Sequence, residues 1–181
     1  QTANDNFINQ NEASKDFFEK FFIPWNAKKV SYPKIEAMWG QSYKNRKVYL
    51  ENHKLATPEW FDKQIDNSNF DEYNTLVKKA ITLKNTNVRV LPTNSVMFYD
   101  PTKPGEGFPF DYNQNSAIKI NTPIIVSHLS KDKAWAYVES SNVGGWVEIG
   151  TIAFVDEKFI QEFKTSNYFV SVKEKFPIYD P

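Results

Sequence analysis

The residues best suited to chemistry lie in a Pro- and Gly-rich stretch near the middle of the chain. Phe110, Asp111, Tyr112 and Gln114 follow one another closely there. The rings offer a flat platform, the carboxylate an acceptor for an ammonium group, and the amide a partner for a peptide backbone. This combination predicts a binding site for a peptide. Alternatively, Phe110 and Tyr112 only pin the loop onto the protein, because burial of one ring contributes ~4–6 kcal/mol before opposing costs.

Two tryptophans complete the candidate substrate-binding set. Trp135 lies in a run of β-formers, and Trp146 follows the pair Gly144-Gly145. A place in the core or against a helix is the main interpretation for both rings, and lining of a binding groove is the alternative. Arg89 is expected to pair with a nearby carboxylate and close the barrel, but the sequence does not name which one.

No catalytic, metal or cofactor site is predicted. The chain has no Cys, and its Ser and Thr residues lack a G-x-S-x-G elbow. His53 and His128 are not part of an H-E-x-x-H pattern, so each is interpreted as solvated or hydrogen-bonded, with His128 capping a turn through Ser130 or Asp132. Acids in loops are usually solvated or cap turns, which is the interpretation for the three in this loop: Asp100, Glu106 and Asp111.

Charge and hydropathy exclude two classes of partner. The 181 residues carry 22 Lys plus Arg and 22 Asp plus Glu, so no net field attracts nucleic acid or an anionic membrane. No apolar run approaches the ~20 residues needed to span a bilayer. The polar opening, residues 1–6, lacks a signal pattern, so the chain is interpreted as a mature product that starts at a trimmed export signal or a cloning boundary.

The first 80 residues show helical patterns. After a polar start, Ser14 is the expected N-cap of a helix that ends before Pro24. Its rings recur with helical spacing and are expected to dock on protein: Phe17, Phe18, Phe21, Phe22 and Trp25. Further helices are predicted from Tyr32 to about residue 48, over 58–66, and from Ser68 to about residue 80.

From Ala80 onward the hydrophobic period changes to two, which is typical of strands. The pattern predicts strands at 80–83 and 88–90, one strand over 118–126, and a hairpin that joins 135–138 to 146–149. Several short strands at close spacing indicate a small barrel of five or six strands. A terminal helix or linker at 159–163 follows, and a strand pattern then restarts at 168–172.

Several short motifs follow one another along the chain: residues 87–93 (NVRVLPT), 105–116 (GEGFPFDYNQNS), 121–123 (NTP), 128–132 (HLSKD), Trp135 and 145–147 (GWV). Taken in this order, they resemble the first SH3-like domain of NlpC-type cell-wall cysteine peptidases. Residues 21–25 (FFIPW) resemble the N-terminal helical stabilising segment of those proteins. The resemblance covers about residues 15–180.

The resemblance implies an α+β fold, with a helical segment packed on a small SH3-like β-barrel and the start of a second such barrel at the C-terminus. The implied domains are a helical stabilising segment over 1–79, a barrel over 80–156, and a linker helix with the first strands of the second barrel over 157–181. Because the last strand pattern stops with nothing to pair, the chain is expected to be a fragment or a truncated product.

The resemblance also implies a function without catalysis in this chain. The chain would target and position peptidoglycan stem peptide for an NlpC-type catalytic domain, which cuts between D-glutamate and the diamino acid. Its expected partners are the stem peptide and that domain. Its expected location is the cell envelope, periplasmic or secreted, with a lipoprotein before trimming as one option. The alternative is a stand-alone SH3-like adaptor that binds a protein partner in the envelope.

Overall fold

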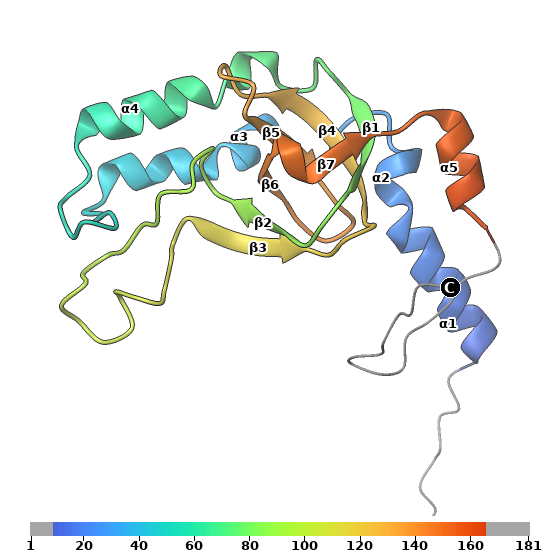
Figure 1. The fold of residues 1–181 in the computed structure, drawn as a ribbon, viewed down its shortest axis with the longest axis horizontal. Coiled ribbons are helices and arrows are strands. Elements are labelled where there is room, and N and C mark those ends of the chain that lie inside the picture. The colour runs from blue at the N-terminus through green and yellow to red at the C-terminus, as the bar shows by residue number, and fades with distance from the viewer. Residues whose placement is uncertain (1–8, 166–181) are drawn as a thin grey trace, which may run out of the picture.

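The computed structural model describes residues 9–165 and has the expected α+β architecture. Helices from the first part of the chain cover a curved sheet (Figure 1). The helices are α1 (Gln10–Phe21), α2 (Ile23–Asn26), α3 (Lys34–Ala37), α4 (Pro58–Asn67) and α5 (Glu157–Phe163), with 3₁₀ turns η1 (Trp39–Asn45), η2 (Phe70–Glu72) and η3 (Ile149–Thr151). The strands are β1 (Lys78–Thr82), β2 (Thr86–Arg89), β3 (Gln114–Ile118), β4 (Pro123–Leu129), β5 (Trp135–Glu139), β6 (Gly144–Glu148) and β7 (Ile152–Phe154).

The described strands form one antiparallel sheet in the order β3-β2-β6-β5-β4-β1-β7. The predicted hairpin is confirmed, with Tyr137 opposite Trp146 and Glu139 opposite Gly144. The sheet has seven strands instead of the predicted five or six, and no described pairing joins β3 to β7, so it curls without closing. The predicted restart at 168–172 lies outside the described residues.

The single strand predicted over 118–126 is wrong, because a turn splits it into the end of β3 and the start of β4. Asn121 takes a left-handed conformation with φ 60°, which Asn tolerates better than most residues. Thr82 holds the turn, since its hydroxyl donates to the Lys119 carbonyl and accepts from Thr122 N at 2.9 Å. The alternation of apolar and polar residues over 118–126 therefore runs through a turn and does not mark one continuous strand.

The N-terminal helices differ from the prediction at their ends. α1 is capped by Asn9 instead of Ser14, and Pro24 lies in the first turn of α2. Phe22 and Trp25 are buried, whereas Phe17 is 56% exposed, so the ring stripe docks mainly at its C-terminal end.

The helices predicted for residues 32–48 and 68–80 are wrong. The first region is split into α3 and η1, and the second has a single 3₁₀ turn, η2. Asn69 is left-handed with φ 50°, and the Ser68 hydroxyl donates to the Gln64 carbonyl of α4 instead of capping a new helix. Ser68 therefore closes α4 and does not start another helix.

The helical segment shares buried clusters with the sheet. One cluster joins Phe22 and Trp25 to Ile81 of β1 and Ile160 of α5. A second joins Ala37 and Phe70 to three rings of β5 and β6: Trp135, Tyr137 and Trp146. The predicted domain boundary between residues 79 and 80 falls inside β1. The helical segment and the sheet therefore do not divide at that position of the chain.

Candidate functional site

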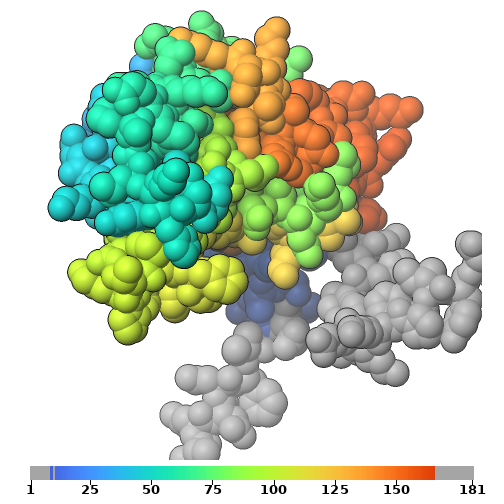
Figure 2. Space-filling model, turned by 60° about the vertical axis from the view of Figure 1, so that its left-hand side comes forward, coloured from blue at the N-terminus to red at the C-terminus, as the bar shows by residue number. Residues whose placement is uncertain are grey.

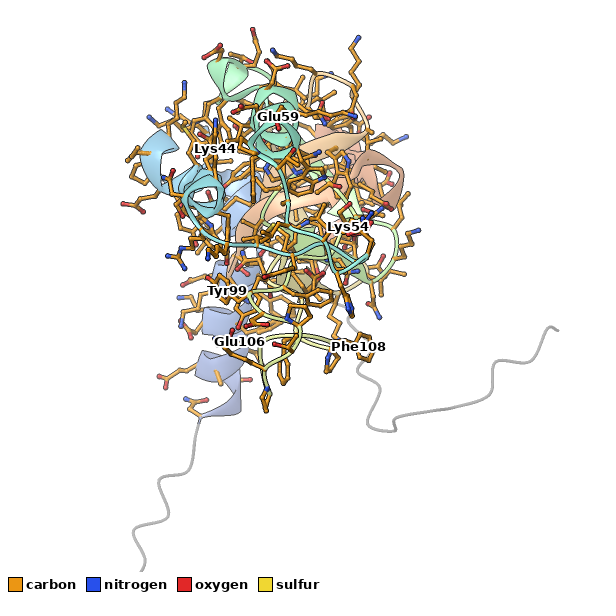
Figure 3. All side chains as sticks on the ribbon, turned by 90° about the vertical axis from the view of Figure 1, so that its left-hand side faces the viewer. Lys44, Lys54, Glu59, Tyr99, Glu106 and Phe108 are labelled. Atoms are coloured by element: carbon orange, nitrogen blue, oxygen red, sulfur yellow. The ribbon has the colours of Figure 1, made fainter. Side chains whose placement is uncertain are left out.

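The long connection between β2 and β3, residues 90–113, is packed on the helices. It pairs with the segment after η1, where Tyr49 and Phe98 exchange two backbone hydrogen bonds of 2.7 and 2.8 Å. At its base, Val90 N donates to the Asn113 carbonyl and Tyr112 N to the Met97 carbonyl. Figure 2 shows the loop as a yellow-green lobe next to the teal helices. Figure 3 shows Tyr99, Glu106 and Phe108 on this lobe, at the opposite end of the molecule from Glu59 of α4.

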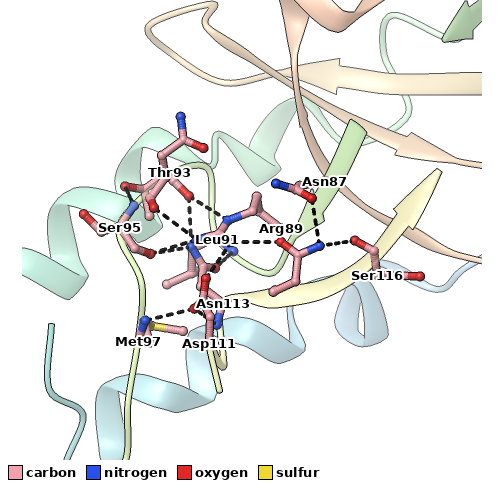
Figure 4. Close-up of polar contacts among 11 residues, drawn as sticks. Asn87, Arg89, Leu91, Thr93, Ser95, Met97, Asp111, Asn113 and Ser116 are labelled. Atoms are coloured by element: carbon pink, nitrogen blue, oxygen red, sulfur yellow. Dashed lines mark hydrogen bonds and ion pairs between the residues drawn. The ribbon is translucent and has the colours of Figure 1, made fainter. Parts of the chain in front are cut away.

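Arg89, at the end of β2, holds the base of this loop (Figure 4). Nη1 donates to Asp111 Oδ2 at 2.7 Å and to Gln114 Oε1 at 2.9 Å. The remaining N–H groups donate to the carbonyls of Thr93, Asn94 and Ser95. A guanidinium has five N–H donors, so this buried side chain is saturated. Asp111 is the carboxylate that the sequence left unnamed as the partner of Arg89.

Two further side chains fix the same base. Asp111 Oδ1 accepts from Met97 N at 3.0 Å and from Asn113 N at 2.8 Å. Asn113 is fully buried, accepts from Leu91 N, and donates to the carbonyls of Thr93 and Ser95. A carboxylate has about four acceptor positions, so Asp111 keeps one beyond its three internal bonds.

A pocket of about 680 Å³ opens beside this base. Four of the six predicted residues line it together: Phe110, Asp111, Tyr112 and Gln114. Phe110 is 54% exposed, and Tyr112 packs on Tyr99 with ring centroids 4.0 Å apart. The pocket thus combines one free ring, one anchored ring and polar groups that are already oriented.

The two predicted tryptophans lie elsewhere. Trp146 is fully buried, and its indole N–H has no acceptor among residues 9–165. Trp135 is 7% exposed and lines two other hollows of the surface. The structure therefore separates both rings from the loop pocket.

Sequence reasoning missed several residues of the loop pocket. They are Asn87, Arg89, Asn94, Val96 and Pro109. Asn87 alternates with buried Val88 along β2 and is exposed, so its outward parity was a usable signal. Asn94 lies at the pocket because Arg89 donates to the carbonyls of residues 94 and 95. No sequence pattern predicts that contact.

The two histidines lie in different settings, and His53 is exposed in a turn. His128 is buried, with Nδ1 3.0 Å from the Ser127 hydroxyl and Nε2 3.0 Å from the Ser68 carbonyl. Burial lowers the pKa of His128, against the opposing effect of the bond to Ser68. The expected turn cap through Ser130 or Asp132 is wrong for His128, because Ser130 bonds Asp132 and the Trp135 backbone instead.

Residues 9–165 show neither a metal site nor a membrane-spanning helix. No cluster of three or more His, Cys, Asp or Glu side chains has an arrangement that could hold a metal ion. No helix in this range combines the length and the apolar character required to cross a bilayer.

Two family models match successive parts of the chain, the first over the helices and the second from inside the long loop onward. Residues 5–73 match the NLPC_P60 stabilising domain, N term, and residues 97–148 match the SH3 domain of SH3b1 type. The chain resembles the N-terminal region of NlpC/P60 peptidases. The NLPC_P60 match covers the helical segment, and the SH3 match covers most of the long loop and the strands β3 to β6.

A solved structure agrees with the NlpC/P60 resemblance. It is described as a novel NlpC/P60 endopeptidase from Photobacterium damselae subsp. piscicida, with 28% sequence identity and a TM-score of 0.77. The match covers 86% of this chain and 39% of the endopeptidase chain. No curated protein matches the chain. Together these matches show that the chain is similar to an NLPC_P60 stabilising domain, to an SH3 domain, and to less than half of an NlpC/P60 endopeptidase.

Proposed function

We propose that this chain is the targeting and substrate-positioning region of a bacterial peptidoglycan hydrolase. Cleavage of the stem peptide, between D-glutamate and the diamino acid, would belong to an NlpC-type catalytic domain with which this region works. This function places the protein in the cell envelope, periplasmic or secreted. The observation that carries the proposal is the loop pocket, which lies in a region similar to that of an NlpC/P60 endopeptidase.

The free groups of the pocket suit a short peptide with an ammonium group. Asp111 offers its remaining acceptor position to the ammonium, while Arg89 keeps the carboxylate in place. Within residues 9–165, the Asn87 side chain uses only its oxygen, which accepts from Gln114, so both of its amide N–H groups can bond a peptide carbonyl. The exposed face of Phe110 then covers apolar side chains of the ligand.

The test is a titration of the ¹⁵N-labelled chain with a synthetic stem tripeptide, followed by backbone amide shifts. Shifts are expected at residues 110–114. Phe110→Ala is expected to raise the dissociation constant about tenfold, because a ring contact is lost. Phe108→Ala is the matched control, since Phe108 is 87% exposed in the same loop and does not line the pocket. Unmoved signals at millimolar peptide, or equal losses in both variants, would contradict the proposal.

The alternative function, a stand-alone adaptor for a protein partner in the envelope, is favoured by one exposed surface. Ile35 is 77% exposed and Trp39 46% exposed, four residues apart where α3 meets η1. Sedimentation with purified, protein-free sacculi separates the two functions. The positioning role requires the chain to sediment with the sacculi, whereas the adaptor role leaves it in solution.

A further inference from the structure

A second hollow, of about 540 Å³, lies where the end of α4 meets residues 92–94 and the turn between β4 and β5. It shares only Asn94 with the loop pocket, so it is a separate site. Its volume falls within the ~300–1,000 Å³ range of small-molecule sites.

Two nearly buried polar side chains open into this hollow without a partner. Gln64 of α4 is 9% exposed, and its side-chain amide makes no hydrogen bond within residues 9–165. Trp135 of β5 is 7% exposed, and its indole N–H likewise has no acceptor there, but it is not sealed from solvent as that of Trp146 is. Neither group is sealed from solvent in residues 9–165, so a ligand that bonds both would take the place of water there.

The charges around these two groups cancel. Two lysines and two aspartates line the hollow: Lys63, Lys131, Asp66 and Asp132. Lys131 pairs with Asp66, and Asp132 accepts from the Ser130 hydroxyl, the Asn67 amide and Ala134 N. A neutral ligand with both a donor and an acceptor therefore fits better than an ion.

We propose that this hollow binds an N-acetylated sugar of a glycan strand. An acetamido group carries a carbonyl acceptor on one side of its amide and an N–H donor on the other, so it can accept from the Trp135 indole N–H and donate to the Gln64 oxygen. The Gln64 NH₂ then remains for a sugar hydroxyl, and Pro92 offers an apolar contact for the acetyl methyl. This glycan contact adds a second ligand to the chain and does not depend on the loop pocket.

The probe is tri-N-acetylchitotriose, titrated into the full ¹⁵N-labelled chain while the five tryptophan indole signals are followed. The signal that disappears in Trp135→Phe identifies Trp135, and in the unmodified chain this signal is expected to shift with saturation. Cellotriose has the same backbone without acetamido groups and is expected to leave it unmoved. The proposal is overturned if the Trp135 indole signal does not shift at millimolar chitotriose, or if it shifts equally with cellotriose.

Matched variants test each hydrogen bond. Gln64→Met and Trp135→Phe are each expected to weaken chitotriose binding about three- to tenfold, the effect of one hydrogen bond. Gln161→Met, on the exposed face of α5, and Trp146→Phe, which removes an equally buried indole, are expected to leave binding unchanged. Equal losses in the controls overturn the site.

Two more outcomes separate this site from the loop pocket. Phe110→Ala is expected to leave chitotriose binding unchanged, so a failure of stem-peptide binding and a failure of sugar binding are distinguishable. A stem tripeptide that shifts the Trp135 indole while chitotriose does not would assign the hollow to peptide and overturn the glycan proposal.

Discussion

At the scale of single residues, the two histidines differ in their surroundings. His128 is 1% exposed and bonded on both ring nitrogens, whereas His53 is exposed in a turn. Because burial lowers the pKa of His128, the folded protein resists taking a proton that the unfolded chain accepts near its ordinary value of about 6.5. The stability contribution of neutral His128 is therefore complete above that value and is lost as the pH falls below it.

Urea unfolding measured from pH 7.5 down to pH 5.5 tests this residue. The free energy of unfolding is expected to fall over that range in the natural chain, and the fall is expected to shrink in His128→Gln. His53→Asn is the control, because Asn tolerates the φ of 58° at that position, and it should keep the full pH dependence. If the free energy of unfolding changes equally with pH in the natural chain and in His128→Gln, other groups cause the pH dependence.

At the scale of elements, one arginine attaches the 90–113 loop to the sheet. Arg89→Lys supplies three donors where five are used, so at least two of the five acceptors of Arg89 lose their partner. The variant is expected to lose ~2–4 kcal/mol of unfolding free energy and the shape of the loop pocket. Arg46→Lys is the control, since Arg46 is exposed and, within residues 9–165, its guanidinium makes one hydrogen bond, to the Tyr99 hydroxyl, beside contacts with the Tyr43 and Tyr99 rings. Comparable losses in both variants would contradict the role of Arg89.

The elements also show what the sequence could and could not predict. The hairpin between β5 and β6 was predictable because two β-branched and aromatic runs lie close together in the sequence, but the turn lies at residues 140–143, and the pair Gly144-Gly145 expected to form it is part of β6. The turn at Asn121 was not, because the alternation on both sides kept its parity and the Thr82 hydroxyl that holds the turn is far away in sequence. Likewise, Phe110 to Gln114 could be grouped as neighbours in the chain, but the Arg89 network that orients them depends on tertiary folding.

At the scale of the whole molecule, the helical segment and the sheet bury each other's side chains. Trp25 of α2 is 1% exposed, lies against Ile81 and Ile160, and donates its indole N–H to the Ala80 carbonyl of β1 at 2.8 Å. Glu139 of β5 holds the chain between α2 and α3 by accepting from Ser31 N at 2.7 Å and from the Ser31 hydroxyl. These contacts tie the first part of the chain to β1 and to the central strand β5.

Such shared burial predicts a single unfolding transition, and Trp25 is the side chain that tests it. Trp25→Ala is expected to lose ~3–5 kcal/mol, because a large core ring and its hydrogen bond are removed together. Helix and strand signals in circular dichroism should still be lost at one urea concentration, since neither part retains a complete core without the other. Trp39→Ala removes a half-exposed ring of η1 and should cost far less. Two separated transitions, with the sheet outlasting the helices, would instead mean that residues 9–79 and the sheet fold as independent units.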